Sequence, residues 1–146
     1  MSGYTTNLVE GLADLLAASG LGTYGPPDEP YPATGTAIVL YVMPAAPDAV
    51  ICLTPYPIED TGGADVVTAV QVRMRAPGAD PRAVTDMADA VRDVLHGREH
   101  YRCRGVPVAL SWRQSQAWLG PDATRRHEIT ANYYARTTRP GPYAHE

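Results

Sequence analysis

Lysine and phenylalanine are absent from this 146-residue chain, and all twelve of its basic residues are arginines. Without lysine the chain has neither the phosphate-binding lysine of a P-loop nor a lysine that forms a Schiff base, which excludes two large enzyme classes. Both missing residues have AT-rich codons, whereas alanine, glycine, proline and arginine are abundant. We therefore expect that the gene comes from a GC-rich genome.

Cysteine is scarce, and the N-terminus lacks a long apolar run. Cys52 and Cys103 have no close cysteine or histidine at metal-ligand spacing, so we expect two buried, reduced thiols and no metal or cofactor site. Glu10 and Asp14 interrupt the first apolar segment, and no basic stretch precedes it. This pattern predicts neither a signal peptide nor a membrane span, and it indicates a protein made and used in the cytosol.

Positive charge is absent from the first half of the chain. Eight carboxylates and no cation precede Arg73 and give −8, and twelve arginines against eight carboxylates from Arg73 onward give +4, which sum to the net −4. A net negative charge argues against a protein that coats DNA. The asymmetry suits head-to-tail self-association, and it equally suits pairing of the two halves inside one molecule.

Two stretches have the spacing of amphipathic helices. From Asn7 to Ala18 leucines recur at three- and four-residue intervals, and Thr6 or Asn7 can cap the start. The second helix begins at Asp80-Pro81, with the aspartate as N-cap and the proline at the first helical position, and it ends at Gly97.

The remaining apolar segments have the pattern of β-strands. In 66–75, Val70, Val72 and Met74 share one face while Gln71, Arg73 and Arg75 share the other, which predicts a half-buried strand. In 106–118 the residues Val106, Val108, Leu110, Trp112 and Trp118 all fall on one parity. The predicted strands are 37–43, 49–56, 66–75, 101–104, 106–118 and 125–137.

The order of these elements, with hairpin-like connections, predicts an α+β fold: a mostly antiparallel β-sheet with two amphipathic helices packed on one face. Apolar residues at 45% and charged residues at 19% are typical of a globular protein. We expect one domain over residues 1–137, followed by a tail, 138–146, that is flexible or ordered by a partner.

Three motifs suggest chemistry, and their context argues against it. The Gly20–Gly25 stretch matches G-x-G-x-x-G, but it follows a helix and runs into two prolines, whereas a dinucleotide site follows a strand and opens a helix. His127-Glu128 begins like H-E-x-x-H, but Ala131 stands where the second histidine is needed, and the segment alternates with period two. No serine lies in a G-x-S-x-G elbow. We therefore expect no catalytic residues, and assembly becomes the leading function class.

Several longer patterns occur in a fixed order along the chain. They are MPxxPD in 43–48 followed by TPYP in 54–57, VxVRMRxxGxDP in 70–81, and LGxDxxRRHExTxNYYxR in 119–136. With the N-terminal amphipathic helix, this layout resembles the tail-terminator and minor capsid proteins of long-tailed bacteriophages. A phage of an actinobacterial host would also fit the missing lysine and phenylalanine.

The resemblance implies a virion structural protein and no enzyme. It implies a homo-oligomeric ring, expected to be a hexamer, at the head-proximal end of the tail tube, which ends tube polymerisation and offers the surface that joins the head. The implied partners are other copies of the chain, the major tail tube protein and the head-completion or connector proteins. Genomic DNA would pass through the lumen without sequence-specific binding, and no cofactor or membrane would be involved.

Local physics suggests which residues make these contacts. The segment between the second and third strands is acidic, rich in glycine and long for a hairpin loop, so we expect it to reach a neighbouring copy or the tube. Arginines on the polar face of the third strand are expected at the subunit contact. The alternatives are a mobile surface loop and exposed arginines of little energetic weight. The candidate interface residues are Ile58, Glu59, Asp60, Thr61, Gly62, Gly63, Asp65, Arg73 and Arg75.

Two rival functions stay open at this point. One is another neck component, such as a head-closure or connector protein, which would form a ring with a different partner. The other is a small cytosolic α+β enzyme whose site is too dispersed to see in the sequence. A stable monomer with a deep polar pocket would favour the enzyme.

Overall fold

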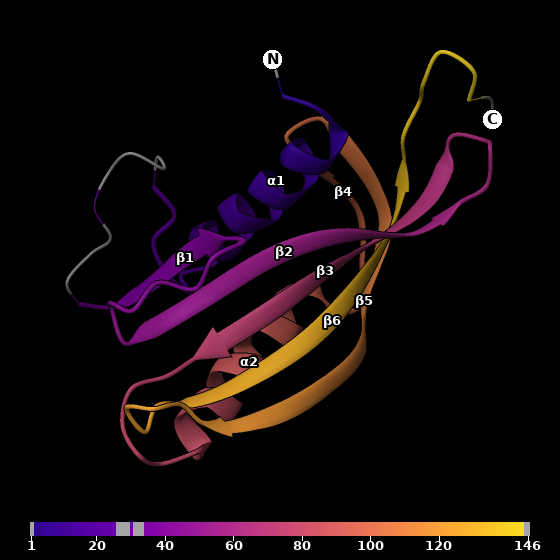
Figure 1. Ribbon diagram of the computed structural model, residues 1–146. Helices are drawn as coiled ribbons and strands as arrows, with labels where there is room; N and C mark the ends of the chain where they lie inside the picture. Colours follow the sequence, from indigo (N-terminus) through magenta and orange to yellow (C-terminus); the bar gives the residue numbers. More distant parts are fainter. Residues whose placement is uncertain (1, 26–29, 31–33, 145–146) are drawn as a thin grey trace.

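A computed structural model describes residues 2–25, 30 and 34–144 of the chain. The α+β prediction is confirmed: two helices and six strands form a mixed sheet in the order β1-β2-β3-β6-β5-β4, and every neighbouring pair except β1–β2 is antiparallel (Figure 1). The elements are α1 (Tyr4–Ala18), β1 (Thr36–Leu40), β2 (Ala49–Asp60), β3 (Asp65–Arg75), α2 (Arg82–Leu95), β4 (Arg98–Cys103), β5 (Val106–Pro121) and β6 (His127–Thr138).

The first two strands are parallel, so the hairpin predicted between them is wrong. Thr36 pairs with Ala49, and the chain therefore runs back along the whole length of β1 before β2 begins. The predicted end of β1 at Met43 is also wrong. The strand stops at Leu40 because Tyr41 has a left-handed backbone, with φ of 68°. Tyr41 and Val42 are 56% and 73% exposed, so their apolar character does not reflect burial in the sheet.

The acidic segment between β2 and β3 is a strand extension and a tight turn, and the prediction of a loop from Pro57 to Asp65 is wrong. Glu59 and Asp60 pair with Val67 and Val66 of β3, across a bulge that follows Pro57. We call residues 58–65, which form the end of this hairpin, the arm. The arm extends from the sheet next to the C-terminal segment (Figure 1), where the N–H of Arg139 donates to the carbonyl of Ala64 at 2.7 Å.

Strand β5 changes face along its length, so the prediction that its alternate residues share one face is wrong. Its register against β6 shifts after Val108, after Arg113 and after Trp118. Each β-bulge adds one residue and turns the following side chains to the other side of the strand. As a result the polar Ser111 is buried on the helix side, and Trp112 pairs with Tyr134 on the opposite side.

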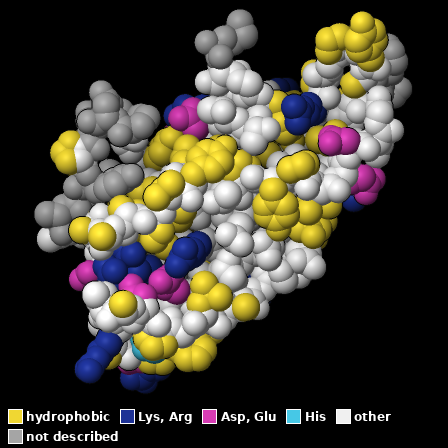
Figure 2. Space-filling view, viewed as in Figure 1, with side chains coloured by type: hydrophobic (Ala, Val, Ile, Leu, Met, Phe, Trp, Pro, Cys, Tyr) yellow, Lys and Arg dark blue, Asp and Glu magenta, His cyan; other side chains and the backbone are white. Residues whose placement is uncertain are grey.

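The side of the sheet away from the helices is only partly covered. Near the start of β2 the loop 41–48 lies over it, and Met43 packs against the small buried cluster that contains Val39, Val50 and Cys52. Beyond this loop, β2, β3, β6 and β5 leave a broad surface that we call the open face. Figure 2 shows apolar side chains over its middle and a compact group of charged side chains where β2 begins and β3 ends. The open face is lined by Thr54, Tyr56, Gln71, Arg73, Thr130, Asn132, Tyr134, Arg136, Trp112, Ser115 and Ala117.

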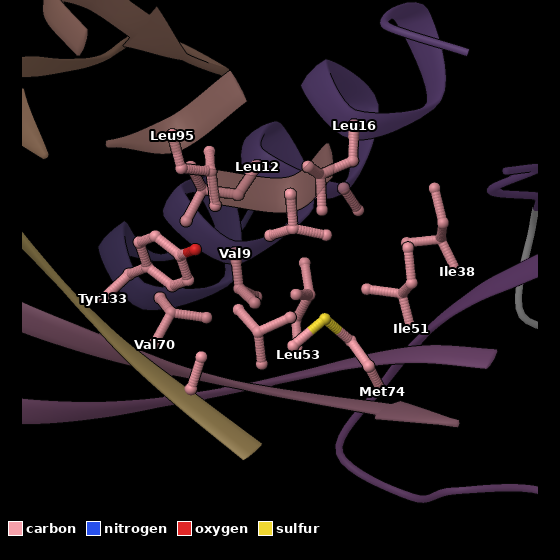
Figure 3. Packing of buried hydrophobic residues seen from close by; sticks show 14 of the residues in the cluster. Val9, Leu12, Leu16, Ile38, Ile51, Leu53, Val70, Met74, Leu95 and Tyr133 are labelled. Atoms are coloured by element: carbon pink, nitrogen blue, oxygen red, sulfur yellow. The ribbon is translucent and has the colours of Figure 1, made fainter. Parts of the chain in front are cut away.

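The main core lies between the other side of the sheet and both helices. Leucines of α1 and valines of α2 pack on the alternate apolar residues of β3 and β6 (Figure 3). Val70, Val72 and Met74 share the buried face of β3, as predicted. Gly11 allows α1 to approach β4 closely, because a Cβ at this position would lie 2.4 Å from the Cα of Cys103. No helix in the described part of the chain is long and apolar enough to span a membrane. The labelled core residues include Val9, Leu12, Leu16, Leu53, Val70, Met74 and Leu95.

Both helix starts differ slightly from the prediction. Helix α1 begins at Tyr4, ahead of the expected caps Thr6 and Asn7, because the Tyr4 hydroxyl is held by hydrogen bonds to the hydroxyls of Thr68 and Thr137. Helix α2 begins at Arg82, two residues after the predicted cap. The carboxylate of Asp80 still accepts the N–H of Arg82 at 3.0 Å, so it satisfies a free donor at the helix start.

Candidate interaction surfaces

The two cysteines are buried and free, as the sequence predicted. Burial in the apolar core, with a smaller contribution from Asp14, raises the pKa of the Cys103 thiol to about 12. In the described part of the chain no group of three histidine, cysteine or acidic residues is placed to hold a metal ion. The features able to contact other molecules are surfaces of the sheet and its connections.

The arm presents acidic and apolar groups on a stiff support. Its turn is held because the hydroxyl of Thr61 donates to the carbonyl of Asp65 at 3.1 Å and accepts the N–H of Gly63 at 3.3 Å. Gly62 takes a left-handed conformation, with φ of 84°, that favours glycine. Ile58 is 40% exposed beside the exposed carboxylates of Glu59, Asp60 and Asp65.

The charges of the arm have no partner within the described part of the chain. Glu59, Asp60 and Asp65 form no ion pair there. A shallow hollow between Asp60, Gly62 and the segment 139–141 separates the arm from the C-terminal segment. The candidate interface residues of this region stay a prediction, and the structure places them in a paired hairpin and not in a loop.

The edge of β2 next to the arm carries two prolines where N–H groups would point outward. The carbonyl of Leu53 accepts the N–H of Tyr41 at 2.9 Å, so residues of the same parity as Leu53 direct their backbone groups toward the β1 side. Strand β1 ends at Leu40, opposite Leu53, and Pro55 and Pro57 continue this parity beyond it. This part of the edge therefore offers carbonyl groups but no N–H donors at these two positions.

The two candidate arginines of β3 have different surroundings. Arg73 lies on the open face with 44% of its side chain exposed, and its Nε donates to Glu128. Arg75 is only 3% exposed. Its guanidinium donates to the carbonyls of Pro44, Pro47 and Asp48 at 2.7 to 2.9 Å. The alternative that Arg75 is an exposed residue of little weight is wrong, because Arg75 is buried and holds the loop 41–48 against its own sheet.

A second arginine holds the same loop. Arg126 donates to the carbonyl of Ala45 at 2.7 Å and forms ion pairs with Asp48 and Asp122. Burial, and then repulsion from Arg126, lower the pKa of Arg75. Partial burial acts to raise the pKa of Asp122, but hydrogen bonds from Arg126 and Thr124 outweigh it and lower this pKa to about 2.

Intramolecular ion pairs account for part of the charge asymmetry. Arg104, after β4, contacts Glu10 and Asp14 of α1, and Arg126 contacts Asp48. These pairs join the basic second half of the chain to its acidic first half. Pairing inside the molecule therefore occurs, yet among the described residues it leaves out the three carboxylates of the arm.

Sequence reasoning missed an aromatic group on the open face. The rings of Trp112 and Tyr134 meet edge to face at 5.8 Å, and the guanidinium of Arg136 lies over Trp112 at 5.8 Å. The hydroxyl of Tyr56 donates to the side chain of Asn132 at 3.0 Å, and Asn132 donates to Ser115 at 3.0 Å.

The alternation in β6 contained the signal for this group. Tyr134 has the same parity as Glu128, Thr130, Asn132 and Arg136, which are the polar residues of the strand. Trp112 could not be placed with Tyr134 from sequence, because the bulge after Val108 reverses the parity of β5.

Comparisons with known proteins agree with this architecture. A family model described as "Bacteriophage tail terminator protein" matches residues 15–139. Among solved structures, the chain is similar to one chain of the "Virion of native gene transfer agent (GTA) particle", with a TM-score of 0.55 and 17% sequence identity over 87% of this chain and 84% of that one. At this identity the likeness shows a shared fold. No curated protein matches the chain.

Proposed function

Because this chain belongs to the bacteriophage tail terminator family, we propose that copies of it form a hexameric ring on the last ring of the tail tube, stop tube growth and present the surface that joins the head. The family is one of structural proteins and not of enzymes, and the protein is a component of the virion tail or neck. The match over residues 15–139, from the last turn of α1 to just past the end of β6, carries the proposal.

The proposed ring uses heterologous contacts, in which two different surfaces of the subunit meet. Such contacts close into a ring when the rotation between neighbours fits, and they need no self-complementary patch. The arm is one candidate for such a surface, since its acidic groups lack partners among the described residues. Arg73, which keeps 44% of its side chain exposed, is the candidate of opposite charge.

The proposed partners follow from the position in the particle. One face of the ring meets the major tail tube protein, and the other meets the head-completion or connector proteins. Genomic DNA passes through the lumen without sequence-specific contacts. A lumen without a basic lining suits this passage, because phosphates bind to clustered arginines.

The proposal is tested by deleting the gene from the phage and imaging the tails by negative stain. Termination predicts tubes of abnormal and variable length without heads, because nothing stops the addition of tube subunits. Complementation with the wild-type chain restores a single length. Tails of normal length that never join heads would contradict termination and indicate another neck component.

A further inference from the structure

The edges of the sheet are poorly suited to joining two copies. On the outer side of β1, Thr23 pairs with Ala37 and occupies the edge. The free part of β2 lacks N–H donors at Pro55 and Pro57. At the other edge, His100 interrupts β4 with a left-handed φ of 50° among charged neighbours. Bulges, prolines and charges on edge strands prevent pairing with another sheet. Copies of the chain are therefore expected to meet through their faces.

One of the two faces is already occupied by the helices, whereas no helix in the described part of the chain covers the open face. Four strands about 4.8 Å apart, with at most about seven residues of about 3.3 Å each, cover on the order of 400 Å². A standard interface buries about 800 Å² on each partner, so the open face can supply about half of a subunit contact.

The open face also has the composition of an interface centre. Tyrosine, tryptophan and arginine are enriched where protein contacts contribute most to binding. Trp112, Tyr134 and Tyr56 are half-buried, and Arg136 is exposed. Within the described part of the chain Arg136 forms no ion pair, and its charge is compensated only by the ring of Trp112.

The arm has complementary properties. It carries the exposed apolar side chain of Ile58 between the aromatic end of β2 and the carboxylates of Glu59 and Asp60. It cannot fold onto the open face of its own molecule, because its backbone is paired within the same sheet. The occupant of complementary charge is therefore the arm of another copy.

We propose that in the ring the arm of one subunit lies across the open face of the next, with Ile58 against Trp112 and Tyr134 and with Glu59 and Asp60 near Arg136. This contact rests on the proposed ring and specifies which two surfaces form it. Its charged pairs set the orientation of the neighbours, and its aromatic centre supplies most of the buried apolar area.

Disulfide trapping between two differently marked chains tests this contact. Chains carrying only Asp60→Cys and chains carrying only Leu110→Cys, at the position opposite Arg136 in the sheet, are co-expressed, purified as full-length protein and oxidised. A disulfide-linked dimer on a non-reducing gel can then come only from two copies. The native Cys52 and Cys103 are buried and provide the background in the wild-type chain. The matched control replaces Leu110→Cys with Thr85→Cys, which is exposed on α2 away from the open face.

The expected result is a strong dimer band for the Asp60 and Leu110 pair and at most background for the Thr85 control. Native mass spectrometry of the same samples separates two kinds of failure. If rings form but only the Thr85 pair cross-links, or neither pair does, the proposed contact is wrong while the ring stands. If no ring and no band form at any concentration, both the contact and the ring are overturned.

Charge reversal gives a second, independent readout. Arg136→Glu or Glu59→Arg alone should weaken ring association about tenfold, because each places like charges together. The double variant restores the pair in reverse order and should recover most of the loss. Equal thermal unfolding midpoints for all three variants show that each subunit is intact. Independent, additive losses in the double variant would contradict the contact.

Discussion

Two tyrosines close to the core differ in what their hydroxyl groups contact. The hydroxyl of Tyr133 is buried in the cluster that contains Val9 and Leu95 and has no hydrogen-bond partner among the described residues (Figure 3). Burial raises the pKa of Tyr133 to about 12. The hydroxyl of Tyr4, in contrast, bonds to Thr68 and Thr137 and connects α1 to β3 and β6.

Phenylalanine at each of the two positions should therefore have opposite effects. Tyr133→Phe removes an unsatisfied polar group and should leave the free energy of unfolding unchanged or raise it slightly. Tyr4→Phe leaves two buried threonine hydroxyls without this partner and should cost about 1–2 kcal/mol. Urea denaturation of both variants measures the difference. Equal losses would show that the Tyr133 hydroxyl has a partner in solution.

Asp122, in the turn between β5 and β6, should make stability depend on acid pH. Its pKa is about 2 in the folded chain, below the usual value of about 3.9 for an unfolded aspartate. The ionised form is thus favoured by folding, so its contribution is complete above about pH 4 and is lost as the pH falls toward 2. Relative to Asp122→Asn, the wild-type chain should be more stable at pH 6, and the gap should shrink between pH 4 and 2. A gap that stays constant would contradict this assignment.

At the scale of the elements, helix α1 packs directly against the backbone of β4 at Gly11, which has no side chain. A Cβ at Gly11 would overlap Cys103, so Gly11→Ala should push the helix off the strand and cost about 1–3 kcal/mol. This cost should exceed the gain of up to about 1 kcal/mol that alanine brings to a helix. Gly3→Ala, with nothing within 4 Å, is the matched control and should be nearly neutral. Thermal unfolding of both variants distinguishes a packing effect from a propensity effect.

The prolines of β2 should keep the free edge from pairing with other sheets. Pro55→Val and Pro57→Thr together restore two outward N–H donors, and we expect faster aggregation with the subunit fold retained. Light scattering during storage, with circular dichroism as the fold control, measures the effect. Pro77→Ala, in the exposed connection before α2, should not change the aggregation rate. An unchanged rate in the double variant would show that the edge is protected by something else.

The sequence predicted elements best where local pattern and burial coincide. Strand β3 and helix α2 were found because their apolar residues alternate with the period of the element that they form. The parallel pairing of β1 was missed because strand direction and register depend on contacts between distant segments. The bulges of β5 were missed because a constant alternation was assumed along the strand, whereas each bulge reverses it.

The candidate interface residues of the arm stay a prediction. Their acidic and glycine-rich composition is visible locally, whereas the strand pairing of the arm depends on β3. Arg75 was assigned to a polar face correctly, yet its burial depends on the loop 41–48 folding back over that face. The aromatic group of Tyr56, Trp112 and Tyr134 comes from three strands and has no signature in any one of them.

At the scale of the whole molecule, the uneven distribution of charge should make assembly more sensitive to salt than folding is. The ion pairs of Arg104 and Arg126 inside the subunit are partly shielded from solvent, whereas the carboxylates of the arm are exposed. Raising the ionic strength shortens the screening length from about 10 Å at 0.1 M to about 3 Å at 1 M. Ring association should therefore weaken across this range while the unfolding midpoint changes little. Sedimentation velocity and thermal unfolding in the same buffers compare the two.

The pairing of β3 with β6 sets when the protein can fold during its synthesis. Asp65 lies opposite Thr138, so the two central strands of the sheet are separated by most of the second half of the chain. While the ribosome is still translating β5, β3 has β2 on one side and no neighbour on the other. A nascent or prematurely released chain that lacks β6 cannot complete the sheet and remains open to proteases.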